Sequence, residues 1–229
     1  MNARSAIQAL LLTAMYLSPL AALRGEDAET ILQTARLNPT THSASLRAQI
    51  RGESSTLPLT IRMKDGVVRY EFTKPDQTIL LKLSPTETEL TEELDGITKP
   101  ISPSHRHDQI RNSGITYQDL SLGFLYWPHP FIQGEETINF RSFWKIDLQA
   151  PATEPLYGVA RIWIDKESGA IWKIEGYDKK GLLLRRFLVT AIQEIDGATM
   201  LKQMRIESFA PGNSHDVLSR NYLEISGKL

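Results

Sequence analysis

Most of the chain consists of short stretches in which apolar and polar residues alternate, separated by tight turns. Residues 57–63 and 68–72 show this alternation on either side of a turn at 64–66, and the pattern continues at 79–83. A period of two is typical of β-strands that bury one face. Short connections join antiparallel strands, because parallel neighbours need long crossovers. The sequence therefore predicts a long antiparallel sheet, built mostly as a meander.

A second series of strands is expected in the C-terminal half, where turns rich in Asp, Lys and Gly again separate alternating stretches. These strands are expected at residues 143–148, 157–164, 170–177, 182–192, 199–209 and 217–225. An acidic strand is expected earlier, at 86–93, whereas residues 97–112 lack a clear period and are expected to form a loop. No linker divides the two series, so we expect one domain over residues 26–229.

Two helices are expected among these strands. The first follows Asp27, which can cap it, and buries one face. That face consists of Ala28, Ile31, Leu32 and Ala35. The second lies within residues 113–128, here named the central segment. There Thr116 and Asp119 have capping-box spacing, and Pro128 ends the helix.

The central segment carries more apolar surface than one short helix needs to dock on a sheet. It either fills an ordinary core or plugs a hydrophobic concavity. A long antiparallel sheet with one apolar face must curl and be covered. We therefore expect a mainly β fold, a half-open curved antiparallel β-barrel covered by an N-terminal helix and a short central helix. A two-sheet sandwich is the alternative.

The N-terminus has the features of a secretory signal, predicted here for residues 1–25. Arg4 precedes an apolar run at 7–16, and Pro19 and small residues follow. Three residues are candidates for the last position of the signal: Ala21, Ala22 and Gly25. Cleavage would release a secreted protein, whereas a retained signal would leave it associated with the membrane.

The composition excludes several classes of protein. The chain has no cysteine, which rules out disulfides, thiol catalysis, Cys-ligated metals and a lipid-modified N-terminal Cys. The formal net charge is −1 and no polybasic block is present, so we expect no nucleic-acid partner.

No catalytic motif is apparent. The chain contains neither Gly-x-Ser-x-Gly nor His-Glu-x-x-His. His105 and His107 would share one side of a strand, but no further ligand is nearby in sequence, so a solvated loop is the better interpretation. We therefore expect no enzymatic activity and no metal or other cofactor.

Four stretches resemble bacterial outer-membrane lipoprotein-sorting proteins, which belong to the LolA/LolB-like superfamily of periplasmic carriers. They are the central segment and residues 161–169, 173–180 and 201–207. The resemblance extends over roughly residues 110–227. The N-terminal half agrees only in the order of signal, helix and strands.

The resemblance implies a half-open barrel whose concave face holds acyl chains of lipids or lipoproteins. It further implies a periplasmic carrier that moves this cargo toward the outer membrane. An inner-membrane export pump or an outer-membrane acceptor would be its protein partner. In the superfamily an arginine holds the lid closed, and four arginines are candidates here: Arg47, Arg51, Arg62 and Arg69.

Candidate ligand-binding residues follow from these patterns. The lid or mouth is expected to include Leu120, Phe124, Leu125, Tyr126, Trp127 and Phe131. The concave face is expected to include Ile61, Tyr70, Phe72, Trp144, Trp163 and Trp172.

Two functions fit this picture, and a third does not. A carrier predicts a large apolar cavity, poorly filled by side chains, beneath the central helix. The alternative is an envelope interaction module, a partner of an inner-membrane export pump, with a filled core. A hydrolase would need a buried polar constellation, which the sequence does not show.

Overall fold

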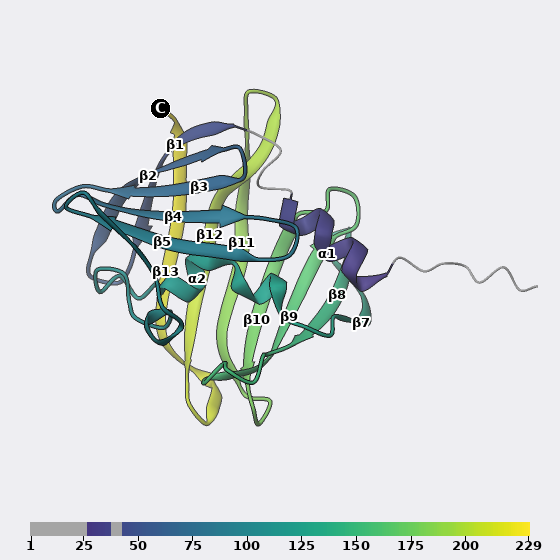
Figure 1. Ribbon diagram of the computed structural model, residues 1–229. Helices are drawn as coiled ribbons and strands as arrows, with labels where there is room; N and C mark the ends of the chain where they lie inside the picture. The colour runs from purple at the N-terminus through teal and green to yellow at the C-terminus, as the bar shows by residue number, and fades with distance from the viewer. Residues whose placement is uncertain (1–26, 38–42) are drawn as a thin grey trace, which may run out of the picture.

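The computed structural model describes residues 27–37 and 43–229. The predicted signal at 1–25 lies outside the described residues, and so do residues 38–42. One 13-stranded antiparallel sheet dominates the described part (Figure 1). Its neighbours run in the order β6-β5-β4-β3-β2-β1-β13-β12-β11-β10-β9-β8-β7. The predicted mainly β meander is therefore confirmed.

The strands belong to two meanders. The first comprises β1 (Ala44–Arg51), β2 (Thr56–Lys64), β3 (Val67–Phe72), β4 (Gln77–Leu83), β5 (Thr88–Leu94) and β6 (Ile97–Pro100). The second comprises β7 (Phe131–Ile138), β8 (Arg141–Gln149), β9 (Tyr157–Asp165), β10 (Ile171–Asp178), β11 (Leu183–Ile195), β12 (Ala198–Ala210) and β13 (Asn213–Lys228).

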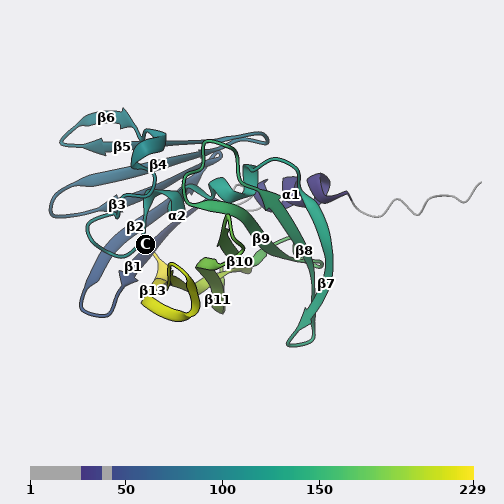
Figure 2. The ribbon, with the colours of Figure 1, turned by 90° about the horizontal axis from the view of Figure 1, so that it is seen from below.

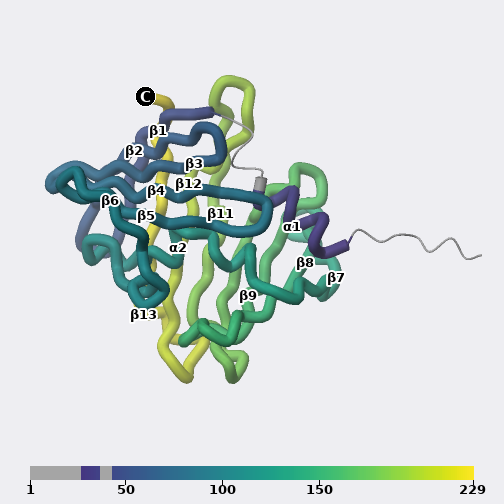
Figure 3. The backbone as a smooth tube through the Cα atoms, viewed as in Figure 1, coloured from purple at the N-terminus to yellow at the C-terminus, as the bar shows by residue number. Residues whose placement is uncertain are grey.

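The two meanders join where the first strand pairs with the last. Ala48 of β1 lies opposite Ile225 of β13, and the C-terminus lies beside β1 (Figure 3). Strands β6 and β7 form the two edges and do not pair with each other. The sheet thus curls without closing, which confirms the half-open barrel (Figure 2).

The helices lie in the hollow of this curved sheet. The first, α1 (Ala28–Leu37), buries Ala28, Ile31, Leu32 and Ala35, as predicted. The central segment contains α2 (Tyr117–Ser121) and the 3-10 helix η3 (Gly123–Tyr126); a further 3-10 turn, η2, covers Pro103–His105. We call the face that packs on α1 and the central segment the concave face, and the opposite one the convex face (Figures 1 and 2).

One hydrophobic cluster fills the hollow. It combines side chains from both meanders with those of α1 and the central segment. Members from the first meander include Ile61, Tyr70, Ile79 and Leu81, and members from the second include Ile146, Leu148, Ile162 and Phe187. The helices are therefore part of the core that joins the two meanders of the sheet.

Three strands differ from the prediction. β1 was not predicted, because Ala48 is too small to mark the alternation clearly. β6 was predicted as loop; all four of its residues are exposed, so it pairs through its backbone without an apolar pattern. β7 was missed because it is an edge strand with no fully buried residue and a bulge between Ile132 and Gly134.

Candidate functional site

The central segment is built by two local signals. Thr116 and Asp119 form the predicted capping box: the Thr116 N–H donates to Asp119 Oδ2 at 2.8 Å, and the Asp119 N–H donates to Thr116 Oγ1 at 3.2 Å. Leu122 then adopts a φ of +51°, which ends α2 and redirects the chain into η3. This turn aims the side chains of η3 into the hollow, where Phe124 and Leu125 are buried.

Aromatic rings hold η3 against the sheet. The Phe124 ring lies 5.1 Å from Trp127, 5.4 Å from Tyr157 and 5.9 Å from Phe187, each in an edge-on arrangement. We call these four residues the aromatic cluster. Edge-on pairs add about 0.5–1.5 kcal/mol each beyond the area that they bury. The cluster thus fastens the central segment to β9 and β11.

An arginine from the sheet holds one end of the segment. Arg185 of β11 forms an ion pair with Asp119, its Nε lying 3.1 Å from Oδ1, and Nη2 donates to the Gly114 carbonyl at 2.8 Å. The two side chains are only 7% and 2% exposed. Asp119 therefore serves both the capping box and the ion pair, and α2 depends on the sheet for its position.

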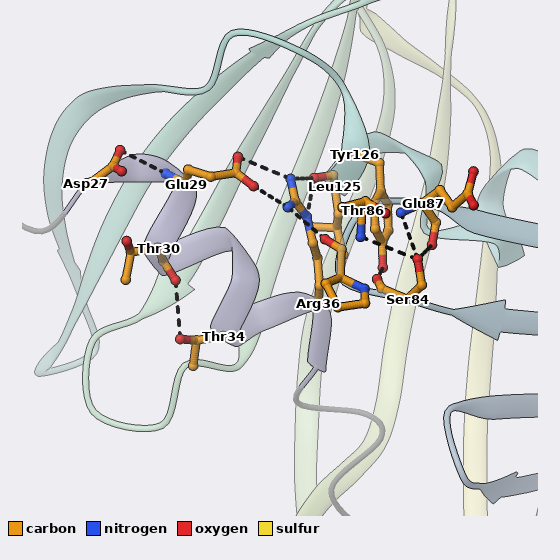
Figure 4. Close-up of polar contacts among 11 residues, drawn as sticks. Asp27, Glu29, Thr30, Thr34, Arg36, Ser84, Thr86, Glu87, Leu125 and Tyr126 are labelled. Atoms are coloured by element: carbon orange, nitrogen blue, oxygen red, sulfur yellow. Dashed lines mark hydrogen bonds and ion pairs between the residues drawn. The ribbon is translucent and has the colours of Figure 1, made fainter.

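A second arginine, Arg36 of α1, holds the other end (Figure 4). Its Nε and Nη2 donate to the Leu125 carbonyl at 3.0 and 2.8 Å, and Nη1 lies 2.5 Å from Glu29. Its guanidinium also lies over the Tyr126 ring at 4.8 Å. The Tyr126 hydroxyl donates to the Ser84 carbonyl at 2.9 Å, which ties η3 to the turn after β4.

Among the described residues, no hydrogen bond or ion pair joins the central segment to any of the four arginines suggested by the resemblance. Arg51 pairs with Glu224 at 2.7 Å, and Arg62 and Arg69 both pair with Glu71. Arg47 is exposed on β1. The sequence did contain a signal for Arg185, since Leu183, Arg185, Phe187 and Val189 share one side of a strand. A charged side chain at a strand position that otherwise faces the core needs a buried partner of opposite charge.

Most of the predicted lid residues come together. Leu120, Phe124, Leu125 and Trp127 are buried in the segment, and Tyr126 is half-buried. Phe131 does not join them: it lies at the start of the edge strand β7 and is 63% exposed. Its place after Pro130 suggested continuity with the segment, but β7 begins there and turns Phe131 to solvent.

The predicted concave-face residues divide between the two faces. Ile61, Tyr70 and Phe72 lie in the hydrophobic cluster of the hollow, and Trp144 packs against it. Trp163 and Trp172 do not belong to that cluster, whereas their neighbours Ile162 and Ile164 do, and Ile171 packs against it. The two tryptophans therefore lie on the convex face, which corrects their assignment.

Local pattern explains this error. Trp163 stands between the inward-facing residues Ile162 and Ile164, so the apolar run gave no alternation to follow. Its indole donates to Glu136 at 2.9 Å. Trp172 sits at a bulge of β10 and packs on Phe143 at 5.8 Å.

The interior beneath the segment is filled. Phe124, Leu125, Ile146, Leu148 and Ile162 have at most 1% of their surface accessible. A side chain this deeply buried borders no void large enough for a water molecule. The poorly filled apolar cavity that a carrier would predict is therefore not found around these residues. A cavity of about 380 Å³ exists elsewhere, between loops, and polar residues line much of it.

The two histidines do not share a site. His105 pairs with Asp108 at 2.7 Å, and His107 pairs with Glu154 at 3.0 Å. Burial by itself would raise the pKa of Glu154. The hydrogen bond from His107 and the backbone N–H groups of Leu156 and Tyr157 outweigh that effect and lower the pKa. Within residues 27–37 and 43–229, no group of three or more His, Asp or Glu side chains could hold a metal.

The helices of the described part are all too short or too polar to cross a membrane.

A family model described as "Uncharacterized protein" matches residues 96–222. No curated protein matches the chain in sequence. Solved structures do match in fold. A domain from Vibrio parahaemolyticus, described as an outer membrane lipoprotein-sorting protein, has a TM-score of 0.67 at 18% identity, with 87% of this chain and 92% of that chain covered.

Two further structures agree. A DUF1329 family protein from Desulfovibrio piger has a TM-score of 0.62 at 17% identity, and the alignment covers 86% of this chain and 89% of that chain. A LolA superfamily protein from Nitrosomonas europaea has a TM-score of 0.60 at 17% identity, and the alignment covers 88% of this chain and 92% of that chain. The chain belongs to the family that the matching model describes, and its fold is that of LolA superfamily and outer membrane lipoprotein-sorting proteins.

Proposed function

We propose that this protein is a non-enzymatic periplasmic carrier that binds acyl chains of a lipid or lipoprotein and moves them toward the outer membrane. The observation that carries the proposal is the aromatic central segment, which occupies the concave face of an open sheet. The fold that this chain shares with lipoprotein-sorting and LolA superfamily proteins supports it.

Because the interior is filled, an acyl chain could enter only by displacing side chains that are already packed there. An acyl chain leaving water gains about 0.8 kcal/mol per buried methylene. To reach the concave face it must displace η3, and the lost contacts of Phe124, Leu125 and Trp127 lower the net affinity. A carrier needs this compensation, because cargo that gained the full burial energy would not be released.

The contacts at the two ends of the segment suit such a movement. Arg185 and Asp119 fix α2, whereas Arg36 and Tyr126 hold η3 through hydrogen bonds to the carbonyls of Leu125 and Ser84. Breaking those hydrogen bonds would leave η3 held by the packing of its apolar side chains, which an acyl chain can replace, and would keep the buried ion pair in place. We therefore assign η3 as the moving part. The acyl chain would contact Leu120, Phe124, Leu125 and Trp127 on one side and Ile61, Tyr70, Phe72 and Trp144 on the other.

A second candidate function is an envelope interaction module that binds a protein, such as an inner-membrane export pump, through its surface. The filled interior favours it, since a module of this kind needs no internal cavity. The two functions differ in whether the central segment ever leaves the hollow.

Native mass spectrometry separates the two functions. The protein would be purified from the bacterial envelope without detergent, offered phospholipid and fatty acid, and extracted to identify any bound species. The carrier predicts a bound acyl lipid that Phe124→Asp abolishes. Phe131→Asp is the matched control, because Phe131 is exposed and lies outside the aromatic cluster. A lipid-free mass that does not change with added lipid would contradict the carrier and favour the interaction module.

A further inference from the structure

The described structure contains a polar pocket of about 380 Å³ that the proposed carrier function does not use. We propose that this pocket binds a neutral polyhydroxyl group, such as a sugar. Loop residues 52–55 and 107–116 border it, together with side chains that rise from β11, β12 and β13. Its volume falls within the usual range of ligand pockets, about 300–1,000 Å³.

The pocket is separate from the apolar hollow. Arg185 lines it, and the same side chain forms the buried ion pair with Asp119 of α2. The residue after Asp119, Leu120, belongs to the hydrophobic cluster. The Arg185 guanidinium also lies 5.9 Å from the Phe187 ring of that cluster, so the Arg185–Asp119 pair lies between the polar pocket and the filled apolar hollow.

A buried amide points to a missing partner. Asn221 of β13 lines the pocket, is only 4% exposed, and its Nδ2 has no hydrogen-bond partner among the described residues. Leaving a buried donor unpaired is destabilising. The Nδ2 atom is closed off in this structure, so a ligand's acceptor oxygen would pair with it once the Asn221 side chain turns toward the pocket.

Two glycines shape the pocket around this amide. Gly114 has a φ of +74°, and a Cβ there would collide with Asn221 Nδ2. A Cβ at Gly52 would lie 3.0 Å from Asn221 Oδ1. Both glycines line the pocket: a side chain at Gly114 would displace the Asn221 amide, and one at Gly52 would crowd it.

The lining selects a neutral ligand over an anion. The two basic lining residues already have carboxylate partners: Arg185 pairs with Asp119, and the His107 ring lies 3.0 Å from Glu154. Glu53 adds a further negative charge. The remaining polar groups are hydroxyls and amides, among them Ser54, Ser55, Ser208, Ser219 and Gln109. Such groups both donate and accept, as the hydroxyls of a sugar do.

The polyhydroxyl group could come from a free sugar or from the headgroup of a lipid. In the second case the acyl chain would have to pass beside the Arg185–Asp119 pair into the hollow, and that case rests on the proposed function. Isothermal titration of the purified protein with maltose, and with dodecyl maltoside below its micelle concentration, distinguishes the sources. Equal affinities indicate the free sugar, whereas tighter binding of dodecyl maltoside indicates the lipid headgroup.

The variants place the binding in this pocket. We expect saturable binding of one equivalent of glucose or maltose, and no binding of acetate or phosphate. Asn221→Leu, which keeps the shape but removes the amide, should weaken sugar binding roughly tenfold or more. Ser219→Ala should weaken it less, and it serves as the second variant if Asn221→Leu does not fold. Ser226→Ala, on the same strand but exposed, is the matched control and should bind like the natural protein.

Three results would overturn the proposal. They are no saturable binding of either sugar, unchanged sugar binding in a folded Asn221→Leu variant, and preferential binding of the anions. Titration with a fatty acid in parallel reports on the hollow alone. Loss of sugar binding with retained fatty-acid binding, or the reverse, therefore shows which of the two proposals fails.

Discussion

Arg185 and Asp119 form a buried ion pair that joins the sheet to the helix in its hollow. Asp119 also closes the capping box with Thr116, so one carboxylate starts α2 and fixes it to β11. The Asp119 side chain thus takes part both in the local capping box and in an ion pair with a residue that is distant in sequence.

Removing one member of this pair should be strongly destabilising. Arg185→Met leaves Asp119 buried without its cation, and we expect a loss of about 3–5 kcal/mol in the free energy of unfolding. The double variant Arg185→Met/Asp119→Leu should lose clearly less than the sum of the single variants. Urea unfolding of all three measures the coupling. Arg62→Met removes an exposed pair with Glu71 and should cost about 1 kcal/mol or less.

The aromatic cluster gives a second prediction. Phe124→Ala removes a side chain that is almost fully buried and contacts three rings, so we expect a loss of about 3–5 kcal/mol. Phe131→Ala, at an exposed position, should change the stability by about 0.5 kcal/mol or less. Similar losses at both positions would contradict the placement of the central segment.

Arg36 should control the mobility of η3. Arg36→Lys keeps the charge but cannot reproduce the fork that donates twice to the Leu125 carbonyl. Amide hydrogen exchange should therefore accelerate in residues 123–127 and change little in β9. Equal acceleration in both regions would indicate a global loss of stability and contradict a specific role in holding η3.

Asp165 should make the free energy of unfolding depend on pH. It accepts hydrogen bonds from Arg141 at 2.8 Å and from the Ser168 N–H, and its side chain is 2% exposed. Burial opposes ionisation, but these bonds outweigh it and lower the pKa to about 2 from 3.8.

Because this pKa is lower in the folded state, the carboxylate stabilises the fold above pH 4. That stabilisation is lost as the pH falls toward 2. Asp165→Asn should cost roughly 2 kcal/mol at pH 7 and almost nothing near pH 2, measured by urea unfolding. An equal cost at both pH values would contradict the ionised state of Asp165.

The sequence predicted the features that arise from local pattern. Alternation and tight turns predicted the antiparallel meander, and the spacing of Thr116 and Asp119 predicted the capping box. The edge strands β6 and β7 were not predicted because neither buries a side chain fully, so neither shows a clear apolar alternation. Their existence depends on neighbours that the local sequence does not reveal.

The site was predicted less completely, because it depends on contacts between distant residues. Phe124 and Trp127 were chosen as candidates from their place in an aromatic segment, and the structure buries both side chains. The faces of Trp163 and Trp172 depend on a bulge and on an uninterrupted apolar run, which alternation cannot resolve. Arg36 bonds to Leu125, 89 residues away, and Arg185 bonds to Asp119, 66 residues away. Local sequence pattern cannot predict contacts over such separations.

Locking the central segment tests the proposed function most directly. The chain has no cysteine, so Ser84→Cys/Tyr126→Cys introduces a unique thiol pair where the Tyr126 hydroxyl meets the Ser84 carbonyl. A bismaleimide would then tie η3 to the turn after β4. Each single-cysteine variant, treated with the same reagent, is the control.

The measurement is the affinity of the double variant for a fluorescent fatty acid, before and after the two thiols are linked. The carrier predicts saturable binding before linking and binding weakened roughly tenfold or more afterwards, because η3 can no longer leave the hollow. Unchanged affinity after complete linking, or no binding in either state, would contradict the claim that the central segment moves aside to admit an acyl chain.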